Sequence, residues 1–284
     1  MLPRIISGLI FAAVFLFGLF SSSSLAPHVV FVIIVAATMM GTHEYYILAR
    51  HKQMRPSPWP GHAISVAFLV DAYFLGFSHF LHILVTCFWL LLMTQVFFKK
   101  HDFSIANMGT SLFGSIYLGL PMGIVLVLFT YPEKWFPLAE TAHLGGNVLI
   151  FLILTSWMTD IGGYCIGKPF GKTKLSPVLS PNKSVEGFIG GLVLSIISGI
   201  LLKLFFPGMD AMFSMWEAAL LPVLFCVMGT LGDLAESAFK RDAGVKDSGK
   251  TYTGHGGMLD IIDSMLLCAP VFFLYLETVR PFFQ

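Results

Sequence analysis

Charge is the scarcest property of this sequence, since only 12% of its 284 residues are Asp, Glu, Lys or Arg. An ordinary soluble domain has about 25% charged residues, whereas 56% of this chain is hydrophobic. So little charge cannot cover a water-exposed surface, which excludes a soluble globular protein and indicates an integral membrane protein. The net charge of +1 says little by itself, and we expect no nucleic-acid partner.

Paired cysteines, internal repeats and long polar segments are also missing. The four cysteines stand singly in apolar runs with no CxxC spacing, and we expect buried, reduced thiols. The first apolar run, from Ile5 to Phe20, is longer than the apolar part of a usual signal peptide, and further runs follow it. We therefore interpret it as an uncleaved first helix.

What the sequence has instead is a series of apolar stretches that approach the ~20 residues of a membrane-spanning helix. Nine of them predict an all-α polytopic membrane protein with about nine transmembrane helices. They fall near residues 5–21, 28–49, 62–80, 81–98, 108–131, 147–166, 187–206, 215–235 and 258–277.

The distribution of Lys and Arg tests that count. With nine spans, 14 of the 17 basic residues lie on one side and only Lys134, Lys203 and Arg280 on the other. Cytoplasmic loops are enriched in Lys and Arg, so the N-terminus and two long polar loops are predicted to be cytoplasmic. We divide the chain into residues 1–145, with about five spans, and 146–284, a catalytic membrane domain with about four spans and both polar loops.

The stretch from Leu231 to Ser264 is the most unusual one for a membrane protein. It carries four acidic residues, and a basic, glycine-rich loop lies between them. Carboxylate oxygens suit a hard cation such as Mg²⁺, while Lys, Arg and glycine amides suit phosphate oxygens. The stretch therefore predicts a divalent metal site that faces phosphates, with the acids Asp233, Glu236, Asp260 and Asp263.

A second polar stretch runs from Thr159 to Gly191 and has the same composition. Asp160 ends one apolar run and Glu186 begins the next, with lysines, glycines and prolines between them. The segment 167–173 is one residue short of a P-loop and no strand is predicted before it. Mobile glycine amides and several lysines can still surround a polyphosphate.

Helical spacing places some of these residues on common faces. Glu236 and Lys240 are four apart, as are Asp233 and Ser237, so each pair shares a helix face. Glu236 with Lys240 is explained equally well by a local ion pair on the helix surface or by a place in the site. Asp233 and Asp260 each lie at the polar end of a span, and we assign them to metal.

These stretches resemble the phosphatidate cytidylyltransferase (CDP-diacylglycerol synthase) family. The family signature is similar to Ser237-x-Phe239-Lys240-Arg241, then Lys246-Asp247-x-Gly249, then His255-Gly256-Gly257-Met258-x-Asp260 and Asp263. Upstream segments around Asp233 and at 180–187 fit as well. The strong likeness covers roughly residues 155–265. The chain departs from the family pattern at Tyr252 and Thr253, and at Ile261, where the family has Arg.

The resemblance implies transfer of a cytidylyl group from CTP to phosphatidic acid in a membrane, with Mg²⁺ and with a second metal ion left open. It implies Asp233, Asp260, Lys240 and Arg241 as catalytic residues, and Asp263 and Asp160 as further metal ligands. Substrate contacts are expected from Lys172, Ser180, Lys183, Ser237, Lys246, His255, Gly256 and Gly257. Expected partners are CTP, phosphatidic acid, membrane lipids and a second copy in a homodimer. The expected location is a bacterial inner membrane, with the active site facing the cytoplasm.

Two rival functions remain open at this stage. A CTP-dependent polyprenol or phytol kinase would carry similar loops but would transfer the γ-phosphate to an alcohol. An ion-coupled transporter would place its charges near the bilayer midplane in repeated halves, whereas here they gather near one membrane face and no repeat is visible.

Overall fold

The computed structural model describes residues 12–98, 105–137, 139, 143–249 and 256–282, and nearly all of its secondary structure is helical. The chain divides into two compact units whose sequences interleave. The first unit is formed by residues up to 130 together with 239–262, and the second by residues 131–238 together with 263–284. The predicted division at residue 145 was made on sequence alone and stays a prediction.

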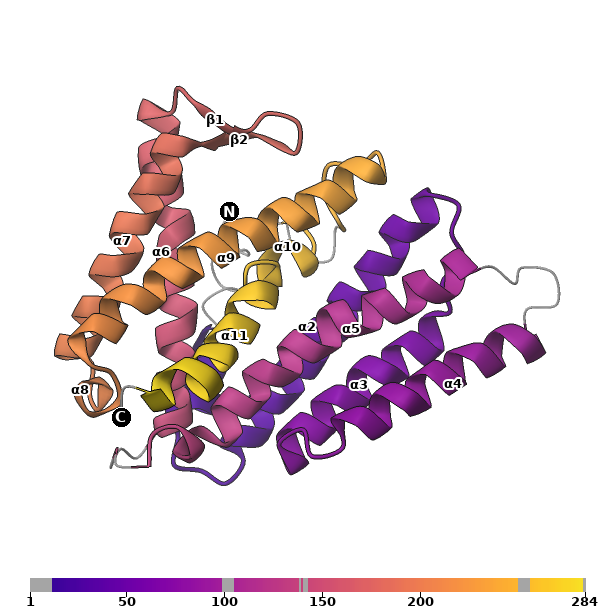
Figure 1. Ribbon diagram of the computed structural model, residues 1–284, viewed down its shortest axis with the longest axis horizontal. Helices are drawn as coiled ribbons and strands as arrows, with labels where there is room; N and C mark the ends of the chain where they lie inside the picture. The colour runs from indigo at the N-terminus through magenta and orange to yellow at the C-terminus, as the bar shows by residue number, and fades with distance from the viewer. Residues whose placement is uncertain (1–11, 99–104, 138, 140–142, 250–255, 283–284) are drawn as a thin grey trace. The chain divides into compact units, whose positions relative to one another are not determined.

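In the first unit, residues 12–20 are helical and are followed by four long helices, as Figure 1 shows. These are α2 (Ala26–His51), α3 (Pro58–Leu75), α4 (Phe80–Phe98) and α5 (Ile105–Thr130). The short helix α10 (Leu259–Ile262) packs on α2. Gly41 allows this close packing, because a Cβ there would lie 2.7 Å from Leu118 on α5 and 3.2 Å from Ile262.

In the second unit, α6 (Leu144–Phe170) packs along α7 (Val185–Phe205), and a β-hairpin lies at one end of this pair (Figure 1). The hairpin joins β1 (Lys174–Ser176) to β2 (Ser180–Ser184) in antiparallel register, with Lys174 opposite Ser184. The remaining elements of the chain are η1 (Pro132–Lys134), α8 (Met209–Met212), α9 (Met215–Asp242), α11 (Met265–Leu274), η2 (Tyr275–Val279) and η3 (Arg280–Phe282). The boundary between the units falls inside α9 and again between α10 and α11.

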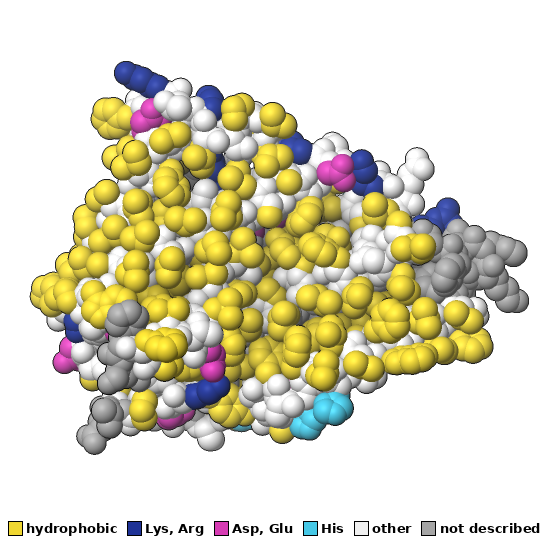
Figure 2. Space-filling model, in the orientation of Figure 1, with side chains coloured by type: hydrophobic (Ala, Val, Ile, Leu, Met, Phe, Trp, Pro, Cys, Tyr) yellow, Lys and Arg dark blue, Asp and Glu magenta, His cyan; other side chains and the backbone are white. Residues whose placement is uncertain are grey.

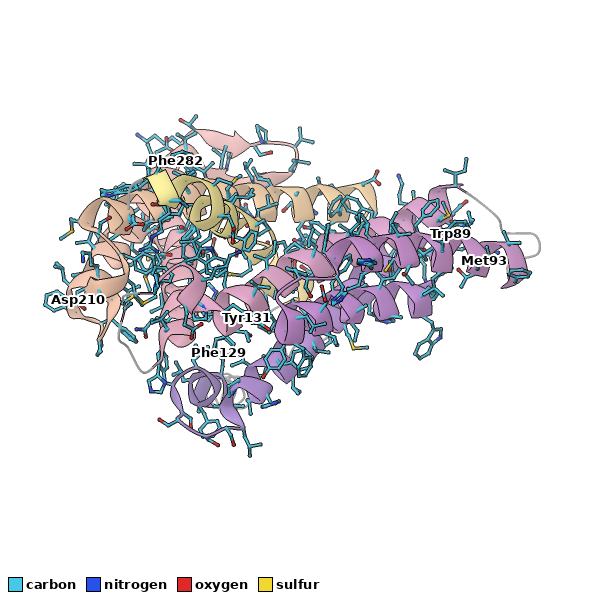
Figure 3. The ribbon with its side chains drawn as sticks, turned by 60° about the horizontal axis from the view of Figure 1, so that its bottom comes forward. Trp89, Met93, Phe129, Tyr131, Asp210 and Phe282 are labelled. Atoms are coloured by element: carbon cyan, nitrogen blue, oxygen red, sulfur yellow. The ribbon has the colours of Figure 1, made fainter. Side chains whose placement is uncertain are left out.

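Hydrophobic side chains cover most of the visible helix surface (Figure 2). On α4, for example, Trp89 is 54% exposed and Met93 38% exposed (Figure 3). Large apolar side chains exposed over whole helices face lipid in a membrane protein, since water would not tolerate them. Six helical segments in the described ranges are long and apolar enough to cross a membrane. The chain is therefore an all-α polytopic membrane protein, as predicted, while the count of nine crossings and the side of the N-terminus stay predictions.

Candidate active site

Glycines on α6 and α7 set the geometry of the second unit's polar end. A Cβ on Gly162 would lie 2.6 Å from the carbonyl oxygen of Gly190, and one on Gly191 would lie 2.5 Å from that of Thr159. No side chain fits at these distances, so the two helices touch through their backbones. This contact brings the Thr159–Asp160 segment of α6 beside the first turns of α7.

The start of α7 is fixed by two side chains. Ser184 is its N-cap residue and accepts a hydrogen bond from the Gly187 N–H (3.1 Å). Glu186 accepts hydrogen bonds from the N–H groups of Lys172 (3.0 Å) and Thr173 (3.1 Å). Glu186 therefore ties the lysine-bearing loop to the helix, with the Lys172 side chain left exposed.

A small cavity of about 200 Å³ opens at this place. Its lining includes Thr159, Asp160, Tyr164, Asn182 and Lys183. The structure thus brings Asp160 and Lys183 to one cavity, while their predicted roles toward metal and phosphate stay predictions. Ser180 lies nearby in sequence on β2 but does not appear among the lining residues.

Lys183 also links this cavity to α9. Its Nζ lies 2.5 Å from Oδ2 of Asp233, and both side chains are partly buried, 25% and 30% exposed. The Ser237 hydroxyl, one turn further along α9, donates to Oδ1 of Asp233 at 3.3 Å. Asp233 is therefore oriented by one cation and one hydroxyl.

Two further carboxylates lie next to this pair. One oxygen each of Asp233, Glu236 and Asp263 lies within 4.8 Å of the others. Glu236 is fully buried and Asp263 is 8% exposed. Carboxylates this close repel one another when ionised, and oxygen ligands of this kind are what Mg²⁺ and Ca²⁺ select. The donor set fits a divalent cation.

The position of Glu236 corrects one of the two readings of the sequence. A surface ion pair with Lys240 required an exposed Glu236, and its burial excludes that location. The i, i+4 spacing identified a shared helix face correctly, but spacing alone could not show that this face points inward.

In the first unit, Asp260 is held by several donors at once. Its Oδ1 lies 2.5 Å from Lys240 Nζ, and its Oδ2 accepts hydrogen bonds from the Ser248 hydroxyl (2.8 Å) and the Gly257 N–H (2.7 Å). Gly256 has a φ of +92°, and a Cβ there would lie 2.7 Å from the Asp260 carboxylate. The two glycines thus let the backbone close around Asp260.

The other residues predicted from the sequence are exposed or lie outside the described residues. Arg241 is exposed, and its Nη1 donates to the carbonyl oxygen of Val245 (3.2 Å). Lys246 is exposed on the following turn. His255 lies outside the described residues, as do Tyr252 and Thr253. Asp233 and Asp260 belong to different compact units, so a single site that contains both stays a prediction.

Sequence reasoning missed Glu44 on α2. This residue is 2% exposed, and its carboxylate accepts hydrogen bonds from the N–H groups of Met258 (3.0 Å) and Leu259 (2.8 Å). The available signal was an acidic residue within the apolar run 28–49, because an ionisable group in a membrane span is a functional candidate by default.

The fold and these two groups of residues define a polytopic membrane protein with carboxylates suited to a metal and lysines suited to phosphates. A sequence profile of the cytidylyltransferase family matches residues 2–279. The chain belongs to the cytidylyltransferase family, which confirms the family resemblance.

Three proteins named phosphatidate cytidylyltransferase are similar to this chain. That of Staphylococcus saprophyticus subsp. saprophyticus is 38% identical over 181 residues, that of Staphylococcus haemolyticus 37%, and that of Staphylococcus aureus 36% over the same length. Each match covers 64% of this chain and 64% of the relative. The aligned region therefore spans a little less than two thirds of these curated relatives.

Proposed function

We propose that this protein transfers the cytidylyl group of CTP to phosphatidic acid, forming CDP-diacylglycerol and pyrophosphate. The observation that carries the proposal is the Lys183–Asp233 pair beside Glu236 and Asp263 in a member of the cytidylyltransferase family. The names of the three staphylococcal relatives support phosphatidate as the acceptor.

In this reaction an oxygen of the lipid phosphate attacks the α-phosphorus of CTP. The bond from the α-phosphorus to the oxygen that bridges to the β-phosphorus breaks, and pyrophosphate leaves with that electron pair. A phosphate monoester is already anionic near neutral pH, so the attacking oxygen needs no general base. The protein's part is to position the reactants and balance their charge.

Cations of the chain fit this charge-balancing role. Lys183 and Lys240 are held in place by Asp233 and Asp260 at 2.5 Å, and Lys172 and Arg241 are exposed to approaching phosphates. Lys246 and His255 are further predicted contacts. Ser180, Ser237 and the backbone at Gly256 and Gly257 would orient the phosphates through hydrogen bonds.

The metal is proposed to be Mg²⁺. Asp233, Glu236 and Asp263 would hold it, and Asp260 and Asp160 are further ligands predicted from the sequence. When bound, a divalent cation neutralises negative charge on the transferring phosphoryl group and the leaving pyrophosphate. The chain's own contribution is to hold these carboxylates in place, which Lys183 and Ser237 do for Asp233.

The experiment uses purified protein with Mg²⁺, two acceptors (phosphatidic acid and a polyprenol as the lipid alcohol), and CTP labelled at either the α- or the γ-phosphorus. The proposal predicts that the α label enters the lipid and the γ label leaves in pyrophosphate. Transfer of the γ label to a lipid alcohol would instead identify a CTP-dependent lipid kinase. Absence of any labelled lipid in the presence of both acceptors would exclude both reactions.

The location is proposed to be a bacterial inner membrane, with both polar loops in the cytoplasm. The distribution of Lys and Arg supports this side. Single cysteines at Lys172 and Lys250 should react only with a reagent on the cytoplasmic side, and one at Lys203 only from outside. Labelling of positions 172 and 250 from opposite sides would contradict a common active site. A homodimer is part of the same proposal, and the mass of the detergent-solubilised protein tests it.

A further inference from the structure

Glu44 stands out among the buried carboxylates of the first unit because it accepts hydrogen bonds from two successive backbone N–H groups of another segment. Its carboxylate accepts from the N–H groups of Met258 (3.0 Å) and Leu259 (2.8 Å), which begin the short helix α10. Removing a carboxylate from water costs several kcal/mol unless hydrogen bonds replace its hydration. The two backbone N–H groups replace part of the hydration that Glu44 loses on burial.

The loop that precedes α10 is shaped around this carboxylate. A Cβ added to Gly249 would lie 2.7 Å from Oε1 of Glu44, and its three nearest atoms would all belong to Glu44. A Cβ added to Gly257 would lie 2.3 Å from Oε2 of Glu44 and 2.2 Å from the Ser248 hydroxyl. Both glycines are therefore required because the loop closes directly over Glu44.

The same segment carries Asp260, which immediately follows Leu259. Ser248 joins the two carboxylates, since its hydroxyl lies 2.8 Å from Oδ2 of Asp260 and 3.3 Å from Oε2 of Glu44. Asp260 in turn holds Lys240 at 2.5 Å. A continuous set of hydrogen bonds thus runs from α2, through the loop and the start of α10, to Lys240.

We propose that Glu44 is a positioning residue that fixes the loop and thereby orients Asp260 and Lys240 for catalysis. The proposal rests on the function proposed above, in which both of these residues act on phosphates or metal. Glu44 itself touches neither substrate nor metal in this account. It acts through the backbone at residues 258 and 259 and through Ser248.

The first test is Glu44→Gln. An amide offers one acceptor oxygen, and its NH₂ would face one of the two N–H groups that the carboxylate now accepts, so at least one of these bonds is lost. We expect a 10- to 100-fold fall in kcat, the range found for groups that orient metal-binding residues. KM for CTP and for phosphatidate should change less than kcat, because the proposed contacts at Lys172 and Lys183 lie outside this loop.

Asp71→Asn is the matched control. Asp71 is also a buried carboxylate of the first unit, 3% exposed, and it accepts a hydrogen bond from a backbone N–H, that of His79 (3.2 Å). Its kcat should stay within about threefold of wild type. Equal losses in both variants would mean that any buried carboxylate matters for folding, and would overturn the specific role of Glu44.

The exchange rate of backbone amide hydrogens tests the positioning role without any measurement of enzymatic activity. In Glu44→Gln the amides of Met258 and Leu259 should exchange at least tenfold faster than in wild type, whereas those of α5 should not change. Unchanged exchange at residues 258 and 259 would overturn the proposal even if the activity fell. If the wild-type protein made no CDP-lipid, the proposed function would fail while this measurement still tested the positioning.

A double-mutant cycle with Gly249→Ala sharpens the test. In the wild-type background the three atoms nearest to the new methyl group all belong to Glu44, and we expect at least a tenfold loss of kcat. In the Glu44→Ala background the obstacle is gone, so Gly249→Ala should cost less than about twofold more. Additive losses would show that Gly249 is needed for another reason and that the loop does not rest on Glu44.

Discussion

Two lysine–aspartate pairs, one in each compact unit, have the same length and different surroundings. Lys183 lies 2.5 Å from Asp233 in the second unit, and Lys240 lies 2.5 Å from Asp260 in the first. Asp260 also accepts hydrogen bonds from a hydroxyl and a backbone N–H, while Asp233 has two more carboxylates within 4.8 Å. Carboxylates therefore surround the Lys183–Asp233 pair, whereas hydrogen-bond donors surround the carboxylate of the Lys240–Asp260 pair.

This difference separates two uses of a buried carboxylate. Hydrogen bonds from Ser248 and Gly257 stabilise the ionised form of Asp260 and fix its direction. Around Asp233, by contrast, three carboxylates lie close together and Lys183 contacts one of them, and such a group of carboxylates suits a divalent cation. We therefore expect substitutions in the Asp233 group to change how the activity depends on metal concentration. Substitutions that disturb the loop around Asp260 should instead change the position of Asp260 and Lys240.

The largest effect is expected from removing a carboxylate of the crowded group. Asp233→Asn, Asp263→Asn and Glu236→Gln keep side-chain shape but remove a charge from the metal site, and each should lower kcat/KM about 10³-fold, on the order of 4 kcal/mol. Asp260→Asn should be similarly inactive, because it loses both its bond to Lys240 and its predicted metal role. Radiolabelled lipid formation in detergent measures these losses.

Glu277→Gln is the control for this set. Glu277 belongs to the same unit but pairs with Lys134 and Trp135 (2.5 and 3.0 Å), away from the Asp233 group in sequence. Its activity should stay within about threefold of wild type. A Glu236→Gln variant as active as Glu277→Gln would remove Glu236 from the metal site.

The next effect concerns the cation of the crowded pair. Lys183→Gln should lower kcat/KM about 10²-fold, near 2.7 kcal/mol, since it loses a partly buried charge that faces both Asp233 and the cavity. Lys203→Gln, at the other end of α7, should have almost no effect. Comparable activity of the two variants would show that the cavity at Lys183 is not a phosphate site.

The smallest effect is expected at Arg241, where an exposed cation is lost. Arg241→Ala should cost about tenfold in kcat/KM for phosphatidate, near 1.4 kcal/mol, because exposed charges are screened by water. Ile261, where the family resemblance leads us to expect Arg, is 39% exposed. Adding Ile261→Arg to Arg241→Ala should recover part of the loss. Independent effects in the four-member cycle would mean that neither residue compensates for the other.

Much of the fold could be predicted from local sequence. Apolar runs located the helices. A membrane helix makes its backbone hydrogen bonds internally, and its length is visible in the sequence as the length of an apolar run. The two strands of the hairpin at Lys174 to Ser184 were not predicted, since they are short, polar and held by contacts with α6 and α7. The break between α10 and α11 was hidden within a single apolar run.

The site was predictable only where its members are close in the chain. Asp233 with Ser237, and Asp160 with its lysine loop, follow from spacing and composition. Glu44 lies more than 200 residues before the loop that it holds, and no local pattern links the two. The burial of Glu236 likewise depends on what packs against its face of α9, which one sequence does not reveal.

We propose that Asp233, Glu236 and Asp263 together bind a divalent cation. The most direct measurement is the binding of Mn²⁺ to the purified protein, followed by electron paramagnetic resonance, in wild type, Asp233→Asn, Asp263→Asn and Asp71→Asn. We expect wild type and Asp71→Asn to bind Mn²⁺ and release it to excess Mg²⁺, while each of the other two variants binds Mn²⁺ at least tenfold more weakly. Undiminished Mn²⁺ binding in both Asp233→Asn and Asp263→Asn would contradict this proposal.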